Sequence, residues 1–235
     1  MNSNSNSIET ISYSQVIDLS HIIDPNIPRW PGDPPVEFES VAELNQDGYY
    51  LRRFSMGEHS GTHMNAPKSF YPDGPGIDRY PARSLVVPSV AIDICDRTAA
   101  NPDYALTKDD ILSWEAKHDD RIPVGSIVLL YTGWQNKWGD AGAFLPQFPG
   151  FGTEATCFML AERGIAGVGI DTHGVDPAVD STFSINKLVL REHKIVLENL
   201  TNLERLPPTG ATLVIGVLRL RGGSGTPVSV LALIP

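Results

Sequence analysis

The chain has 235 residues, of which 41% are apolar and 20% are charged, and its formal net charge is −10. This acidic balance argues against a nucleic-acid surface, because binding phosphates requires clustered Lys and Arg. No apolar run reaches the roughly 18 residues that a membrane helix needs, so we expect no membrane span. Length and composition are instead typical of one loop-rich enzyme domain whose partner is a small molecule or a protein.

The chain opens on MNSNSNS, which is polar, low in complexity and not followed by the basic and apolar regions of a signal peptide. We therefore expect residues 1–12 to be a disordered tail and residues 13–235 to form a single domain. The two cysteines, Cys95 and Cys157, are too few for a disulfide framework and lack C-x-x-C spacing, which favours reduced thiols. These features together predict a cytoplasmic protein.

Pro- and Gly-rich segments without periodicity come early in the chain, at 24–36 and 65–83, and long structured loops of this kind are often functional. Runs rich in Val, Ile and Leu follow and predict strands. These runs cover residues 86–94, 126–132, 165–171, 194–198, 212–221 and 226–234. The last two flank the sequence GGSG at 222–225, which predicts a hairpin.

Two helices are predicted between these strands. Thr107 begins the run TKDDILSWEAKH and has Asp110 three residues on, which is a capping-box pattern. Thr153 precedes the run EATCFMLAER, and Gly164 can end the helix that this run forms. We expect both helices to be scaffold.

The stretch HSGTHMNAPKSF, residues 59–70, suggests a metal site. In a straight strand His59 and His63 would lie roughly 13 Å apart, at about 3.3 Å per residue. One metal ion with bonds of about 2.1 Å cannot bridge that distance, so the chain must bend, and Gly61 permits a positive φ. Asn65 continues the series 59, 61, 63, 65 of alternate residues, so its side chain can point to the same place as the two histidines. Its neutral oxygen suits Mg²⁺ or Mn²⁺ better than zinc. Two hydrogen-bonded structural histidines would fit the same spacing, so both interpretations stay open here.

This motif and several other segments resemble those of a known family. The motif His-x-Gly-Thr-His-x-Asp-x-Pro-x-His is typical of the metal-dependent cyclases and hydrolases that include bacterial kynurenine formamidase and isatin hydrolase, and the chain departs from it at Asn65 and Ser69. The segments DLSHIIDPNIPRWPGDPP, GIDT and IVLENL and the terminal hairpin are also similar, so the resemblance covers nearly the whole chain. It implies an α/β fold of the swivelling β/β/α type with a mostly β core, and a homo-oligomer.

The resemblance also implies which residues bind metal. His59 and His63 fall on family ligands, and Asn65 falls on an aspartate that bridges two metals. Glu198 matches the glutamate of the second metal, whose partner histidine is replaced here by Asn186. The replacements at positions 65 and 186 predict that the second metal position is lost. One divalent ion, Zn²⁺ or Mn²⁺, would then be held by His59, His63 and Asn65.

Other positions are candidates for catalysis and substrate binding. Ser69 replaces a family histidine that resembles a general acid/base, and a serine is a poor base at neutral pH. His173, just beyond a predicted strand, and Glu198 are the candidate replacements, so we take all three as candidate catalytic residues. Trp30 matches a family aromatic residue that contacts the substrate. Asp176 is expected to be surface charge.

Three functions follow from these observations. The first is a metal-dependent hydrolase of a formamide, cyclic amide or lactone in an aromatic small molecule, similar to the arylformamidase of tryptophan catabolism. The second is a cyclase, lyase or isomerase that uses the same pocket with one metal or none, because the replaced residues keep the site polar. The third is a pseudoenzyme that binds a small molecule without turnover. The retained His59, His63 and Glu198 favour the first.

Overall fold

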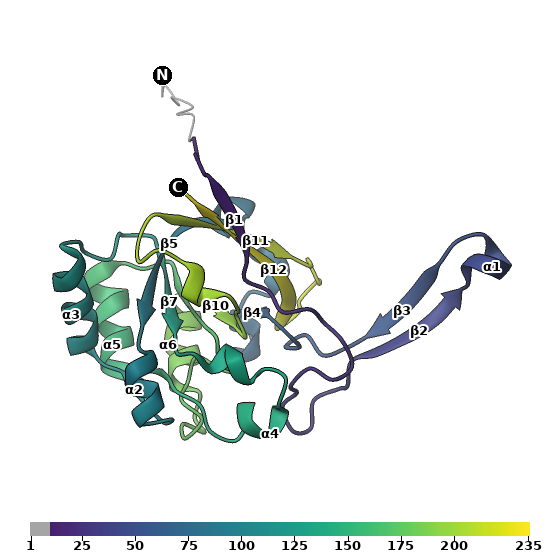
Figure 1. Ribbon diagram of the computed structural model, residues 1–235, viewed down its shortest axis with the longest axis horizontal. Helices are drawn as coiled ribbons and strands as arrows, with labels where there is room; N and C mark the ends of the chain where they lie inside the picture. Colours follow the sequence, from purple (N-terminus) through teal and green to yellow (C-terminus); the bar gives the residue numbers. More distant parts are fainter. Residues whose placement is uncertain (1–9) are drawn as a thin grey trace.

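The computed structural model describes residues 10–235, and its centre is a sheet of eight strands (Figure 1). The strand order is β1-β12-β11-β5-β7-β9-β10-β4, and β4 also pairs with β12, so the strands other than β1 close into a barrel-like ring. The strands of this sheet are β1 (Gln15–Asp18), β4 (His63–Asn65), β5 (Val86–Asp93), β7 (Ile127–Tyr131), β9 (Gly167–Ile170), β10 (Ile195–Glu198), β11 (Ala211–Val217) and β12 (Gly225–Ile234).

The core lies on both faces of this sheet. Strands β5, β7, β9 and β10 run parallel, and strands of that kind are buried on both sides, which explains their continuous apolar sequences. In β7, Ile127 and Leu129 join the cluster inside the ring, while Val128 and Leu130 join the cluster beneath the helices. Alternation along one strand therefore supplies both clusters.

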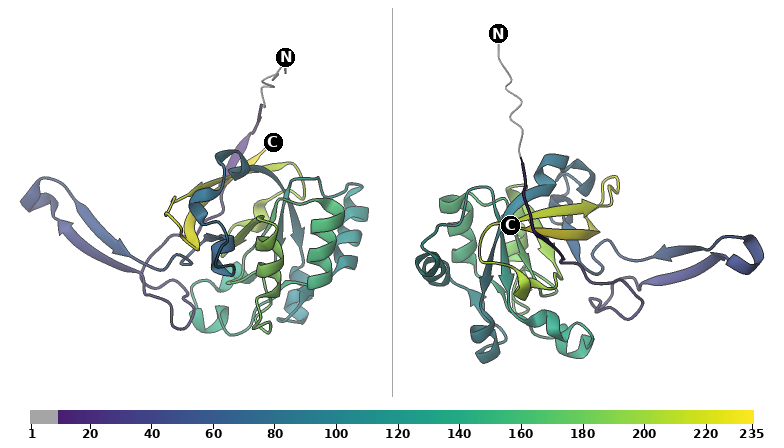
Figure 2. Two further views of the ribbon diagram at one scale, coloured as in Figure 1. Left: turned by 180° about the vertical axis from the view of Figure 1, so that it is seen from behind. Right: turned by 45° about the horizontal axis from the view of Figure 1, so that its top comes forward.

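The longer helices cover the outer face of the parallel strands (Figures 1 and 2). Ile111 of α3, Ala155 of α5 and Val189 of α6 pack in one cluster with the outward side chains of β7 and β9. The helices are α1 (Leu44–Asp47), α2 (Cys95–Ala100), α3 (Lys108–His118), α4 (Ala141–Phe144), α5 (Thr153–Phe158) and α6 (Ser184–Arg191). A π-helical turn, Met159–Arg163, continues α5.

A long hairpin projects from the body of the molecule (Figures 1 and 2). It consists of β2 (Glu37–Ala42) and β3 (Leu51–Ser55), which pair antiparallel, with α1 at its tip. A second small pair, β6 (Ala105–Leu106) and β8 (Gly150–Phe151), is parallel. The sequence patterns did not predict the projecting hairpin, because few of its side chains are buried and its strands lack an apolar face.

The expected fold class is confirmed, and most predicted elements occur where expected. Thr107 and Asp110 form the capping box at the start of α3, and Gly164 ends the helical segment after α5 in a left-handed conformation. The strand expected at 212–221 ends at Val217 instead, where leucines begin to alternate with arginines and are exposed. Helix α6 was missed, because the segment before it is rich in turn residues.

Other expectations concern the termini and the environment. Residues 1–9 of the expected tail lie outside the described residues, and residues 10–12 carry no helix or strand. Both cysteines are free. Across residues 10–235, no helix has the length and apolar character needed to cross a membrane. The single-domain boundaries and the cytoplasmic location stay predictions.

A buried ion pair joins the end of α3 to the turn after α5. Arg163 donates to both carboxylate oxygens of Glu115, over 2.7 and 2.8 Å, and the backbone N–H of Ile122 also donates to Glu115. Both charged side chains are buried. The hydrogen bonds from Arg163 hold the pKa of Glu115 below its usual value. Removing one partner would leave the other charge buried and unpaired.

Glu115→Ala is therefore expected to lower the free energy of unfolding by about 3 to 5 kcal/mol at pH 7. Because the pKa of Glu115 is lowered in the folded state, its contribution is present above the unfolded value of about 4.3 and is lost as the pH falls. Urea unfolding at pH 7 and pH 3 measures both effects. The control Glu39→Ala removes the exposed pair with Arg53 and should cost under about 1 kcal/mol. Equal losses in the two variants would contradict the prediction.

Candidate active site

The short strand β4 places the predicted site residues beside one another. It lies between β10 and β12, and its register puts His63 opposite Glu198. Asn65 lies opposite Val196 on one side and Gly225 on the other. Side chains two residues apart, and side chains directly opposite across a ladder, share a face of the sheet. The pairing of β4 therefore gathers His63, Asn65 and Glu198 at one point.

The predicted bend before β4 is confirmed. Gly61 has a φ of +64°, and the rings of His59 and His63 meet edge to face with centroids 5.2 Å apart. Asn199 Nδ2 donates to Gly61 O over 2.8 Å, and Thr62 Oγ1 donates to Asn199 O over 2.5 Å. These bonds tie the bend to the end of β10.

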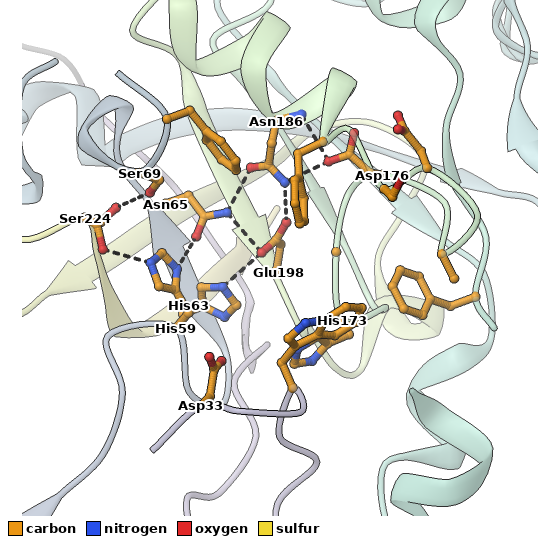
Figure 3. Close-up of a pocket in the computed structure, with 18 of the residues that line it drawn as sticks. Asp33, His59, His63, Asn65, Ser69, His173, Asp176, Asn186, Glu198 and Ser224 are labelled. Carbon is orange, nitrogen blue, oxygen red and sulfur yellow. Dashed lines mark hydrogen bonds and ion pairs between the residues drawn. The ribbon is translucent and has the colours of Figure 1, made fainter. Parts of the chain in front are cut away.

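The carboxylate of Glu198 is the centre of the polar network in Figure 3. Its Oε1 accepts from Asn186 Nδ2 at 2.9 Å and from Val175 N at 3.0 Å. Its Oε2 accepts from Asn65 Nδ2 at 3.0 Å and from His63 Nε2 at 2.9 Å. Burial alone raises the pKa of Glu198, but the hydrogen bonds, first that of His63, outweigh it and lower the pKa to about 2. An ionised carboxylate held this way is a weak proton acceptor, which favours a positioning role over proton transfer.

Helix α6 delivers Asn186 to this network. Asp176 fixes the start of the helix by accepting the N–H groups of Ile185 and Asn186, and it also accepts Asn186 Nδ2 at 2.9 Å. The expectation that Asp176 is surface charge is wrong, because the side chain is buried against the helix end. Burial raises its pKa to about 6, although its hydrogen bonds act in the opposite direction.

His59 lies on the other side of Asn65. Its Nδ1 is 2.8 Å from Asn65 Oδ1, and its Nε2 is 2.9 Å from Ser224 Oγ. The ring packs against the backbone of Gly225, where a Cβ atom would come within 2.7 Å of His59 Cε1. Burial, and after it the nearby His63, lowers the pKa of His59.

A cavity of about 480 Å³ opens in front of the network. All the predicted site residues line it, namely Trp30, His59, His63, Asn65, Ser69, His173, Asn186 and Glu198. Trp30 stacks on His173 with ring centroids 5.4 Å apart, and Phe70, Phe148 and Phe183 add apolar wall. Burial lowers the pKa of His173 to about 4, so the ring is neutral near pH 7. The structure thus brings every candidate residue to one place, while the roles assigned to them stay predictions.

The residues expected to bind a metal are hydrogen-bonded to one another. His63 faces acceptors with both ring nitrogens, because Nδ1 is 3.0 Å from Gly61 O and Nε2 faces the ionised Glu198. Asn65 offers its oxygen to His59 and its N–H groups to Glu198 and Asn186. Among residues 10–235, no group of three or more His, Cys, Asp or Glu side chains is arranged to hold a metal ion.

A metal ligand must present a free lone pair, so this hydrogen-bond pattern does not fit a resident ion. His63 Nε2, one of the predicted ligand atoms, is directed at Glu198 Oε2 over 2.9 Å instead. The single divalent ion therefore stays a prediction.

Sequence reasoning did not assign a role to two residues of the network. Ser224, in the turn before β12, contacts His59, and it accepts a hydrogen bond from Ser69 Oγ at its carbonyl oxygen over 2.7 Å. Asp176 is the other. A serine between glycines in the GGSG hairpin was the only available signal for Ser224, and no local pattern marks Asp176 as buried. Ser69, whose hydroxyl donates to that carbonyl, supports the turn.

Gly61→Ala is expected to lower the free energy of unfolding by more than the about 1–2 kcal/mol that a left-handed non-glycine residue costs. The added Cβ would also lie 3.3 Å from Ile23 Cγ1, so either the Ile23 side chain or the bend between the two histidines has to shift. Gly48→Ala is the matched control, since its φ is +76° and its Cβ would have no atom within 4 Å. Urea unfolding measures stability, and ring ¹⁵N NMR signals report the histidines. Unchanged signals of His59 and His63 in Gly61→Ala would contradict this role of the glycine.

Comparison with known proteins places this geometry in a family. The family model described as "Putative cyclase" matches residues 17–177. Isatin hydrolase of Roseibium aggregatum is 34% identical, and the match covers 94% of this chain and 92% of that protein. Kynurenine formamidase of Bacillus mycoides is 27% identical, and the match covers 92% of this chain and 95% of that protein. The structure of isatin hydrolase A from Labrenzia aggregata bound to benzyl benzoate superposes with a TM-score of 0.87 at 32% identity. The superposition covers 94% of this chain and 93% of that one. These relatives are hydrolytic enzymes, as the sequence led us to expect, and the chain belongs to the cyclase family.

Proposed function

We propose that the protein hydrolyses the C–N bond of a small aromatic amide, formamide or lactam, or the C–O bond of the corresponding lactone. The observation that carries this proposal is the cavity, which combines aromatic walls with a polar network at one end. Sites for small molecules have this composition, with a few polar groups that fix the orientation of an otherwise apolar ligand. Similarity to isatin hydrolase and kynurenine formamidase supports the substrate class.

The aromatic pair is the proposed binding platform for the ring of the substrate. Trp30 and His173 stack with an interplanar angle of 7°, and the edge of Phe144 contacts His173 from the side. A neutral imidazole can accept or donate one hydrogen bond to a polar substituent.

The proposed reaction places the scissile carbonyl at the other end of the cavity, near His59 and Ser224. Both residues line the cavity together with Asn65 and Glu198. Hydrolysis there requires a nucleophile and a group that protonates the leaving nitrogen. The two carboxylate oxygens of Glu198 already accept hydrogen bonds from four donors. We therefore assign Glu198 the role of orienting Asn65 and His63.

The purified protein is expected to hydrolyse at least one member of a panel that contains isatin, N-formylkynurenine, an aryl formamide and an aromatic lactone. Trp30→Ala should raise KM about tenfold or more, which corresponds to about 1.4 kcal/mol of binding free energy. Product formation by liquid chromatography, with the metal content of the same sample, is the measurement. Tyr13→Ala, an exposed aromatic change away from the cavity, is the control.

The outcomes separate the three functions. Turnover that depends on a bound divalent ion supports the predicted metal, and turnover without one supports the network as described. Products of unchanged elemental composition would instead indicate a cyclase or isomerase. Binding of the panel without any turnover would overturn the proposal in favour of a small-molecule binder.

We also propose that the protein forms a homo-oligomer through the β2–β3 hairpin. A two-stranded hairpin is marginally stable alone in water, yet this one projects away from the body. Its exposed apolar side chains are Val41, Leu44, Tyr49, Tyr50, Leu51 and Phe54. A patch of this kind on an extended arm is typical of a protein contact.

The double variant Tyr50→Ser and Phe54→Ser is therefore expected to lower the mass in solution to that of the 25.6 kDa chain. Light scattering after size exclusion measures the mass. Val124→Ser, an exposed apolar residue on the body, should leave the mass unchanged. A monomeric wild-type protein would contradict this proposal.

A further inference from the structure

We propose that Phe183 is a specificity-determining residue of the site. Its ring, together with that of Phe70, would admit flat aromatic rings and exclude rings that carry bulk above and below their plane. This inference rests on the proposed hydrolytic function and names the residue that selects the substrate. Two observations carry it, the position of the ring at the opening of the cavity and the strained backbone that holds it there.

The ring of Phe183 lies where the cavity meets solvent. Phe183 lines the cavity, yet 43% of its surface is exposed. Phe70 follows the turn at 67–69 and also lines the cavity, and the two rings meet with centroids 5.5 Å apart and planes tilted by 42°. A second aromatic pair therefore lines the cavity besides Trp30 and His173, and an entering ligand meets part of it.

The backbone of Phe183 is in the left-handed region, with φ of +56° and ψ of +45°. Among residues 10–235, the other non-glycine residues with a positive φ are Asp119, His193, Asn199 and Asn202. Asn, Asp and His are the side chains that adopt this region most often, whereas a bulky apolar residue there is an outlier. The conformation is unfavourable because Cβ comes too close to the following carbonyl oxygen.

Hydrogen bonds on both sides of Phe183 hold this conformation. Asp180 accepts from the backbone N of Thr182 over 2.7 Å and from that of Ser184 over 3.2 Å. Lys187 Nζ donates to Thr182 O over 2.7 Å, and Lys187 N donates to Phe183 O over 3.0 Å. Backbone strain persists only where the surrounding structure determines the conformation several times over, as it does here.

The turn into α6 does not by itself require a phenylalanine. Glycine or asparagine at position 183 would make the same left-handed turn with less strain. Nor does the ring offset the strain as a core phenylalanine would, because nearly half of its surface stays in solvent. Strained residues cluster at ligand clamps, where the strain is part of the function. We therefore assign the ring a role in binding.

The geometry of the pair determines which rings can pack against it. Aromatic rings pack offset or edge to face at centroid distances of about 4.5–7 Å, whereas a saturated ring has hydrogens on both faces that prevent so close an approach. Tyr71 Oη donates to Lys187 O over 2.9 Å, which ties the segment that carries Phe70 to the helix that follows Phe183. The two segments therefore resist moving apart, and we expect a flat aromatic amide to be preferred.

The test compares formanilide with N-cyclohexylformamide, which share the formamide group and differ in the ring. The measured quantity is the ratio of their kcat/KM values. Comparing this ratio between a variant and the wild type cancels the intrinsic reactivity of the two formamides. Phe183→Gly keeps the turn and removes the ring, so we expect it to lower the preference for formanilide by about tenfold or more.

Asp119→Gly is the matched control for the glycine substitution. Asp119 is also left-handed, with φ of +49°, but it is exposed at the end of α3 and does not line the cavity. Its variant should keep the wild-type ratio within twofold. An equal fall in the ratio of the two variants would overturn the role of Phe183.

A stability measurement separates strain from packing. Phe183→Leu keeps a bulky apolar side chain in the left-handed conformation, whereas Phe183→Gly relieves it. The midpoint of urea unfolding should therefore be higher for the glycine variant than for the leucine variant, although glycine has the smaller side chain. At an unstrained position glycine would be the less stable of the two, so that order would overturn the strain argument.

Binding without turnover distinguishes failure of this inference from failure of the proposed function. Dissociation constants of benzamide and cyclohexanecarboxamide, measured by ligand-observed NMR, should show the same fall in preference in Phe183→Gly. Hydrolysis of formanilide with an unchanged ratio in this variant would overturn the inference and leave the hydrolase intact. A binding preference that the variant loses, without turnover of any amide by the wild type, would support the inference and overturn the hydrolase. Neither binding nor turnover would overturn both.

Discussion

The buried charge of Glu198 is the constraint on which the site depends. A carboxylate removed from water is costly unless each oxygen is paired, and here four donors from three elements meet it. Strand β4 supplies His63 and Asn65, the segment before α6 supplies the N–H of Val175, and α6 supplies Asn186. Burial and pairing together fix the positions of these groups, because moving any one leaves the charge unsatisfied.

Two of the residues that depart from the family pattern, Asn65 and Asn186, contact this same carboxylate. Asn65 and Asn186 each place an amide N–H₂ group on Glu198, and at position 65 the aspartate of the family motif would repel the carboxylate instead. The oxygen of Asn65 is thereby left to His59. The neutral amides thus complete a hydrogen-bond network around Glu198 that also includes His63. The family fold is kept, with these two amides in the site.

The barrel-like sheet explains why so short a strand can organise the site. Strand β4 has three residues, but it is paired on both sides, by β10 and by β12. That pairing brings together Ser224 and His59, which are far apart in sequence, and the ring of His59 lies between Ser224 Oγ and Asn65 Oδ1. The parallel strands and the helices behind them bury the other face and make this platform rigid.

The amino-acid sequence by itself determined the buried strands, the capped helix α3, the bend at Gly61 and eight of the residues that line the cavity, because each depends on local pattern or on a recognisable motif. It did not indicate the projecting hairpin, the burial of Asp176 or the contact of Ser224 with His59. Those depend on which strands pair and in what register, and on where each side chain finds a partner. A single sequence does not encode that information in neighbouring residues, so only the tertiary structure decided how the histidines and asparagines of the site are connected.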